Sequence, residues 1–181
     1  MSRWTARAQA HATPEQLLEV LTHPEEIRRW SPVDFCVGEF EGHRLAAGTR
    51  TKVTGRLAGV SVSFDVEVHS ADAARLELSA EGPIGLDVRY EVADADAGAE
   101  LTASVSVRRG GGLTGRLVAN ATATLLSAGA LDGATGRIAQ AAESQSGRGY
   151  LGRSTGVGRV SSDAGAGAAG RPAPALVGSV A

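Results

Sequence analysis

Few residues of this chain have the type and spacing that chemistry requires. The four histidines, His11, His23, His43 and His69, are dispersed, and none has a second ligand at the spacing typical of a metal site. The lone cysteine, Cys36, has no histidine nearby that would activate it as a nucleophile. We therefore expect no metal and no catalytic residue.

Four carboxylates are close enough in sequence to suggest an acid–base pair. Asp65 and Glu67 lie in one alternating segment, and Asp87 and Glu91 lie in another. Each alternates with apolar residues, so its side chain is expected on the solvent side of a strand. Surface charge is therefore the better interpretation than general acid or base catalysis.

A glycine run at 110–115, GGGLTG, fits the dinucleotide-binding pattern G-x-G-x-x-G. That site also needs a buried parallel strand before the run and a further strand after the helix that follows. The preceding segment alternates, and no strand pattern follows the helix. We therefore interpret the run as a flexible loop leading into a helix, and we expect no cofactor.

A two-residue period recurs in segments between residues 4 and 107. Apolar residues alternate with polar ones from Val60 to Val68, from Ile84 to Val92 and from Leu101 to Val107, and shorter segments flank these. Such alternation is typical of antiparallel strands with one buried and one solvated face. With the strand expected at residues 4–10, the sequence predicts seven strands.

Helical patterns precede and follow the expected meander. Thr13, Pro14 and Gln16 form a capping-box start, Pro24 begins a second short helix, and Pro32 ends it. A long helix is expected from near Leu113. Its buried stripe is formed by Leu113, Leu117, Ala121, Leu125, Ala128 and Leu131, with Val118 widening it and Ile138 continuing it. Gly129, Gly133 and Gly136 weaken its second half, which is expected to kink or fray.

This order of elements resembles the START/polyketide-cyclase superfamily, also called SRPBCC. The resemblance is carried by Ala12-Thr13-Pro14-Glu15, Leu17, Val20-Leu21-Thr22, Pro24-Glu25, Ile27 and Arg29-Trp30-Ser31-Pro32. It implies an α+β helix-grip fold, in which a seven-stranded antiparallel sheet wraps around a long C-terminal helix. It places this domain at residues 1–144. Residues 145–181 are rich in glycine and alanine, and we expect a disordered tail that the fold does not need.

Strand parity and helix spacing place a mostly apolar group of residues between sheet and helix. The candidate ligand-binding residues are Trp30, Thr51, Phe64, Val66, Val88, Tyr90, Val105, Asn120 and Leu125. Trp30 has two interpretations: it gates the mouth of a pocket, or, as we favour, it packs the short helices onto the sheet. Tyr90 is the first residue we would suspect if a substrate were turned over.

Three functions remain open at this point. The first is binding of a small hydrophobic molecule such as a lipid, isoprenoid or polyketide. The second is an enzyme similar to polyketide cyclases or dehydratases, and the third is an accessory protein with a filled core. A cavity above about 300 Å³ would favour ligand binding.

Composition narrows the possible partners and location. The net charge is −2, with 18 basic and 20 acidic residues, which does not suit a nucleic-acid partner. No apolar run is long enough to span a membrane, and the N-terminus lacks the pattern of a signal peptide. Together with the single cysteine, these features lead us to expect a cytoplasmic protein.

Overall fold

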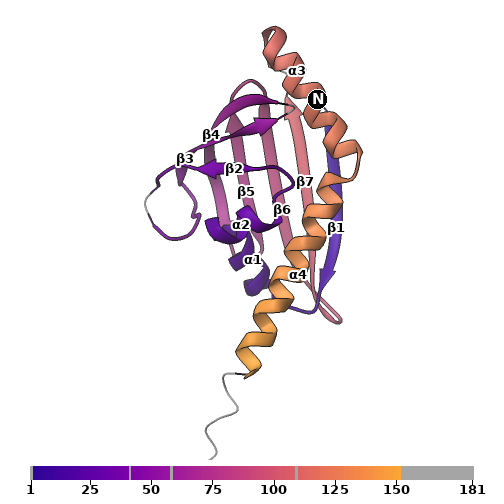
Figure 1. Ribbon diagram of the computed structural model, residues 1–181. Coiled ribbons are helices and arrows are strands. Elements are labelled where there is room, and N and C mark those ends of the chain that lie inside the picture. The colour runs from indigo at the N-terminus through magenta and orange to yellow at the C-terminus, as the bar shows by residue number, and fades with distance from the viewer. Residues whose placement is uncertain (1, 41, 58, 109, 152–181) are drawn as a thin grey trace, which may run out of the picture.

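The computed structural model describes residues 2–40, 42–57, 59–108 and 110–151, and it has the α+β helix-grip architecture (Figure 1). Within these residues, seven antiparallel strands form one sheet in the order β1-β7-β6-β5-β4-β3-β2. The strands are β1 (Ser2–Ala10), β2 (Phe35–Val37), β3 (Arg50–Leu57), β4 (Val60–Asp72), β5 (Arg75–Glu81), β6 (Gly85–Ala95) and β7 (Gly98–Arg108). The predicted fold class is confirmed.

The first and last strands pair with each other, which brings the ends of the predicted meander together. Ser2 lies opposite Val107, and Ala10 lies opposite Ala99. Strands β2 to β7 follow one another as hairpins, as the alternating segments predicted. An irregularity in β4 between Val68 and Ser70 shifts its register with β5. Such a bulge bends a strand and increases its local twist.

Two short helices connect β1 to β2, as the capping signals predicted. In α1 (Pro14–Thr22), the Thr13 hydroxyl accepts from the Gln16 backbone N–H at 3.4 Å, and Gln16 Oε1 accepts from the Thr13 N–H at 2.9 Å. In α2 (Pro24–Trp30), His23 is the N-cap but makes no capping bond with its side chain. Leu17, Val20 and Leu21 of α1 are almost fully buried, so α1 contributes directly to the core.

The C-terminal helical segment consists of two helices, α3 (Gly112–Ser127) and α4 (Ala130–Leu151). The break falls at Gly129, whose φ of +86° lies in the left-handed region that favours glycine. Gly133 and Gly136 remain inside α4. Helix α4 packs along β1 and against α1, whereas α3 extends past the end of the sheet (Figure 1).

Helix α4 includes residues that the sequence places in the tail. It continues past the expected boundary at 144/145 as far as Leu151. Ser146 donates to Gln16 Oε1 at 2.7 Å, which ties this end of α4 to α1. The rest of the predicted disordered tail, residues 152–181, lies outside the described residues.

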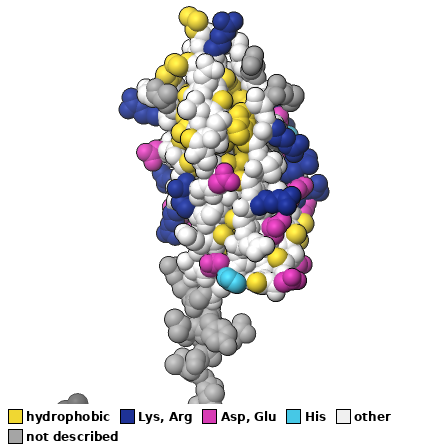
Figure 2. Space-filling model, turned by 90° about the vertical axis from the view of Figure 1, so that its right-hand side faces the viewer, with side chains coloured by type: hydrophobic (Ala, Val, Ile, Leu, Met, Phe, Trp, Pro, Cys, Tyr) yellow, Lys and Arg dark blue, Asp and Glu magenta, His cyan; other side chains and the backbone are white. Residues whose placement is uncertain are grey.

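The predicted buried stripe is wrong for α3. Leu113, Leu117 and Leu125 are 85%, 51% and 37% exposed, and Ala128 is also exposed. Figure 2 shows the side of the molecule that is on the right in Figure 1, and apolar side chains lie at the surface in its upper part. The buried residues of α3 are Gly115 and Val118, and of these Val118 belongs to the expected stripe.

Close contacts between the glycine run and Pro83 accompany this orientation of α3. A Cβ at Gly110 would overlap the carbonyl oxygen of Pro83, and one at Gly115 would lie 2.7 Å from the same atom. These contacts fix the start of α3 against the β5–β6 turn with Gly115 facing inward. The glycines therefore allow close backbone packing, which gives the run a structural explanation that needs no bound nucleotide.

The convex face of the sheet carries the charged residues. The four carboxylates considered for acid–base chemistry all form exposed ion pairs there: Asp65 with Lys52, Glu67 with Arg50, Asp87 with Arg108 and Glu91 with Arg89. The chemistry of any internal site must therefore come from other residues.

Candidate functional site

A cavity of about 340 Å³ lies between the concave face of the sheet and the helices. Strands β3 to β7 form its floor, and helices α1 to α4 together with residues 31–33 and β2 form its roof and mouth. The described side chains that line it carry no charge: Leu21, Pro24, Ile27, Trp30, Ser31, Pro32, Val33, Phe35, Val37, Leu45, Thr51, Val53, Val66, Leu76, Leu78, Leu86, Val88, Tyr90, Val105, Thr122, Leu126, Ala130, Leu131 and Ala134. The interior is therefore partly empty and strongly apolar.

Most of the candidate ligand-binding residues meet at this cavity. Six of the nine line it: Trp30, Thr51, Val66, Val88, Tyr90 and Val105. Val88 lies opposite Leu78 on β5 and Val105 on β7, so the three form a continuous apolar strip across the floor. The two-residue period thus identified the inward-facing strand residues.

The other three candidates lie elsewhere. Phe64 is on the inner face of β4, but its ring packs over Gly82 at the end of β5, where an added Cβ would lie 2.8 Å from the Phe64 ring. Asn120 is exposed and borders a separate surface hollow with Gly110 and Arg116. Leu125 also faces outward, and its neighbour Leu126 lines the cavity in its place.

The sequence carries a signal for several lining residues beyond the nine candidates. Val53, Leu78 and Leu86 share the parity of the inward-facing candidates on the same sheet. The sequence does not indicate that Leu126 and Thr122 line the cavity, because α3 is apolar on more than one side. Their inward position depends on how α3 is rotated.

Nearly every polar side chain in the wall donates a hydrogen bond to the backbone. The Thr51 hydroxyl donates to the Gly38 carbonyl at 3.1 Å, and the Thr122 hydroxyl donates to the Val118 carbonyl at 2.8 Å. The Ser31 hydroxyl donates to the Val33 carbonyl at 2.8 Å. The Trp30 indole N–H donates to the Val20 carbonyl at 3.3 Å. None of these groups needs a ligand to satisfy its donor.

Trp30 joins the short helices to both the sheet and α4. Its ring meets Tyr90 edge-on, with centroids 6.1 Å apart and planes at 73°. Its carbonyl accepts from Arg137 Nε of α4 at 3.0 Å. Trp30 therefore packs α2 onto the fold, the interpretation favoured from the sequence, while its ring also forms part of the cavity wall.

Tyr90 is the exception among the polar groups of the wall. The residue is 7% exposed, and burial raises the pKa of its phenol far above its ordinary value of 10.0, so it stays protonated at neutral pH. Within the described part of the chain its hydroxyl has no hydrogen-bond partner. Every fully enclosed side-chain oxygen or nitrogen in the described residues has a hydrogen-bond partner. The Tyr90 hydroxyl has none, so it is not fully enclosed and is open to the cavity that Tyr90 lines.

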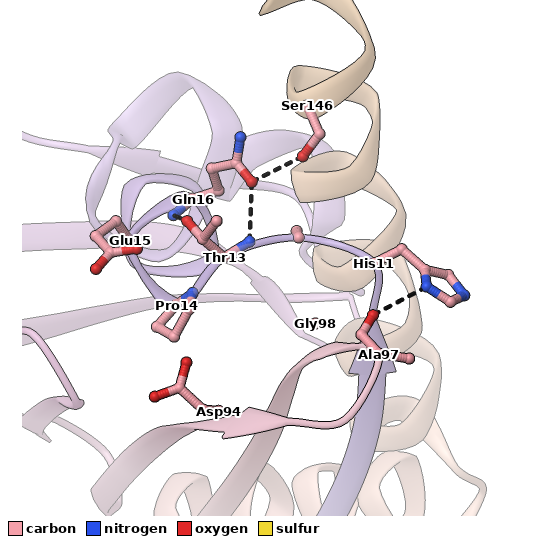
Figure 3. Close-up of a pocket in the computed structure, with 10 residues that line it drawn as sticks. His11, Thr13, Pro14, Glu15, Gln16, Asp94, Ala97, Gly98 and Ser146 are labelled. Carbon is pink, nitrogen blue, oxygen red and sulfur yellow. Dashed lines mark hydrogen bonds between the residues drawn. The ribbon is translucent and has the colours of Figure 1, made fainter. Parts of the chain in front are cut away.

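A second hollow, of about 590 Å³, lies at the surface where β1 meets α1 (Figure 3). Three of its polar side chains are engaged in structural bonds: Gln16 bonds with Thr13 and Ser146, and the His11 Nδ1 bonds with the Ala97 carbonyl at 3.0 Å. A hydrogen bond from Thr13 holds the pKa of the Glu15 carboxyl below its ordinary value. This hollow therefore belongs to the joint between α1, α4 and the β6–β7 turn.

Metal-ligand clusters and membrane-spanning helices are both missing from the described residues. Across residues 2–151, apart from the three positions left out, no group of three histidine, cysteine or acidic residues could hold a metal ion. Within the same part of the chain, no helix is both long and apolar enough to cross a bilayer.

The family of the chain follows from a match over most of its length. Residues 1–143 match the family described as polyketide cyclase/dehydrase and lipid transport. The chain belongs to this family. The match covers the sheet, both short helices and most of α4. No curated protein was found to match the chain.

Solved structures support the same fold. TTHA0849 from Thermus thermophilus aligns with a TM-score of 0.61 and 15% identity, over 80% of this chain and 99% of that one. The KanY protein aligns with a TM-score of 0.57 and 16% identity, over 78% and 97%. DynU16, from the dynemicin biosynthetic locus, aligns with a TM-score of 0.52 and 21% identity, over 80% of this chain and 48% of its own.

Proposed function

We propose that this member of the polyketide cyclase/dehydrase and lipid transport family binds a small, uncharged, hydrophobic molecule in the cavity between sheet and helices. The observation that carries the proposal is the cavity of about 340 Å³ with no charged side chain in its described wall. Ligand sites in proteins are typically mostly apolar clefts of roughly 300–1,000 Å³. A lipid, isoprenoid or polyketide of modest size would suit such a site.

Binding is favoured over catalysis by the chemistry of the wall. A cyclase or dehydratase needs a group that accepts or donates a proton, and the described wall offers hydroxyls and one indole. The carboxylates that might serve are paired with arginine or lysine on the opposite face. An accessory role with a filled core is disfavoured by the size of the empty volume.

The location proposed for this activity is the cytoplasm. Cys36 is exposed and unpaired, which suits a reducing compartment. The partner proposed is the small ligand itself, without nucleic acid.

The test uses uptake of the uncharged fluorescent probe N-phenyl-1-naphthylamine. The wild type should show saturable fluorescence enhancement. Val88→Phe and Val105→Phe should abolish it, because each adds a ring to the cavity floor, while the melting temperature changes little. Ser106→Phe is the matched control, since Ser106 neighbours Val105 on β7 but faces the other side of the sheet.

Two results would overturn the proposal. One is a wild type that never enhances probe fluorescence. The other is strong destabilisation by both cavity variants, since adding methylenes to a filled core typically costs about 1–3 kcal/mol. If the Val88→Phe and Ser106→Phe variants both take up the probe as well as the wild type does, the probe binds at a different surface.

A further inference from the structure

Among the polar side chains of the described cavity wall, only the Tyr90 hydroxyl lacks a protein partner. Ser31, Thr51, Thr122 and Trp30 all donate to backbone carbonyls. Tyr90 lies on β6 between strands β5 and β7, opposite Leu76 and Ala103, so its neighbours across the sheet offer only apolar side chains. Because the hydroxyl is open to an apolar cavity and has no protein acceptor, an acceptor on a ligand would satisfy it.

The charge of the wall limits what that acceptor can be. No arginine, lysine or histidine is among the described lining residues, so a carboxylate or phosphate drawn into the cavity would be buried without a counter-ion. A neutral oxygen avoids this cost. The Tyr90 phenol remains a donor throughout the physiological pH range, because its own ionisation is disfavoured by burial.

The packing around Tyr90 holds the donor in place. The edge-on contact with Trp30 restrains the ring on one side. Trp30 is itself held in place, because its indole N–H donates to the Val20 carbonyl and its own carbonyl accepts from Arg137. A fixed donor loses little side-chain entropy when it binds. The hydroxyl is therefore suited to select one orientation of a ligand whose remainder is apolar.

We propose that the ligand carries an uncharged oxygen acceptor, such as a ketone carbonyl, and that the Tyr90 hydroxyl donates a hydrogen bond to it. The proposal rests on the binding function argued above, and it defines the ligand class more narrowly. It covers neutral ketones and similar carbonyl compounds with an apolar skeleton. It excludes pure hydrocarbons as the preferred ligands, and it excludes free fatty acids and other anions.

Three probes of nearly the same shape test this proposal by displacement of N-phenyl-1-naphthylamine. They are 2-acetylnaphthalene, which has a ketone, 2-isopropenylnaphthalene, in which a methylene replaces the oxygen, and the 2-naphthoate anion. The wild type should bind the ketone about two- to twelvefold more tightly than the alkene, the range expected for one neutral hydrogen bond. Naphthoate should bind more weakly than both.

The variant Tyr90→Phe should remove the preference of ketone over alkene, because the donor to the ketone oxygen is lost. Its melting temperature without ligand should equal or exceed that of the wild type, because the change removes a hydroxyl that has no partner. A clear loss of stability would show that the hydroxyl is already satisfied within the protein, and it would overturn the proposal.

The outcomes separate this proposal from the proposed function. Equal binding of ketone and alkene by the wild type, or preference for naphthoate, would overturn the ligand class and leave a hydrophobic binding protein. Failure of N-phenyl-1-naphthylamine and of all three probes to bind would overturn the binding function, and the ligand class with it.

Discussion

Single glycines decide where α3 sits on the fold. Gly115 approaches the Pro83 carbonyl so closely that a Cβ would lie 2.7 Å from its oxygen and 2.9 Å from the carbonyl carbon of Gly110. Gly136, in α4, has nothing within 4 Å of the position that a Cβ would occupy. The same substitution should therefore have opposite effects at the two positions.

We predict that Gly115→Ala lowers the free energy of unfolding by about 1–3 kcal/mol, because the methyl group meets backbone atoms that cannot move independently. Gly136→Ala is the matched control. It should raise the free energy of unfolding by about 0.4–1 kcal/mol, since alanine restricts the unfolded chain and fits the helix. Chemical denaturation measures both, and a Gly115→Ala protein as stable as the wild type would contradict the contact with Pro83.

Charged side chains form cross-strand pairs on the convex face of the sheet. Glu77 of β5 lies opposite Arg89 of β6, and its carboxylate accepts from the Arg89 guanidinium at 2.9 Å. This hydrogen bond holds the pKa of the Glu77 carboxyl below its ordinary value of 4.5. Arg50 lowers the pKa of Glu67 in the same way between β3 and β4.

The lowered pKa of Glu77 predicts a pH dependence of stability. Its contribution is fully present above pH 4.5 and is lost as pH falls through the lower pKa of the folded state, because the unfolded chain binds the proton more readily. Glu77→Gln should therefore flatten the decline of melting temperature below pH 4.5. Both side chains are partly exposed, so the effect should be small and should shrink at high salt.

A matched control for this experiment is Glu19→Gln, because Glu19 is exposed on α1 and forms no ion pair with the described residues. This control should keep the acid sensitivity of the wild type. If Glu77→Gln behaves in the same way as the control, the pair with Arg89 contributes nothing measurable.

At the scale of the whole molecule, helix α4 at the C-terminal end of the fold packs back onto the elements at its start. Ala142 and Ile138 of α4 are completely buried, and Glu143 accepts from the backbone N–H of His11 at 2.8 Å. Further along, Ser146 reaches Gln16 of α1 (Figure 3). The last described turns of α4 therefore add contacts beyond residue 144, where the sequence predicts the end of the domain.

Two truncations test how far the folded domain extends. Ending the chain after Leu151 should leave the melting temperature unchanged, because residues 152–181 offer few large apolar side chains to bury. Ending it after Ser144 should keep the fold but lower the melting temperature by a few degrees, since the Ser146–Gln16 hydrogen bond and the end of α4 are lost. A large drop for the chain that ends at Leu151 would mean that residues 152–181 dock onto the domain.

The sequence by itself determined which strand residues face inward. In an extended strand the side chains alternate strictly between two faces, so Val66, Val88, Tyr90 and Val105 had only one apolar side on which to lie. The cap at Thr13 and the proline at position 14 likewise defined the start of α1 from local chemistry alone. These features depend on short-range geometry, which is why sequence reasoning predicted them.

Only the tertiary structure decided the rotation of α3 and the space left beneath it. Helix α3 has leucines on more than one side, so its sequence allows either Leu125 or Leu126 to face inward. The close approach of Gly115 to Pro83 and the break at Gly129 place Leu126 at the cavity and leave Leu125 at the surface. Whether the interior is filled or open depends on the distance between the helices and the sheet. Contacts between residues far apart in the chain set this distance.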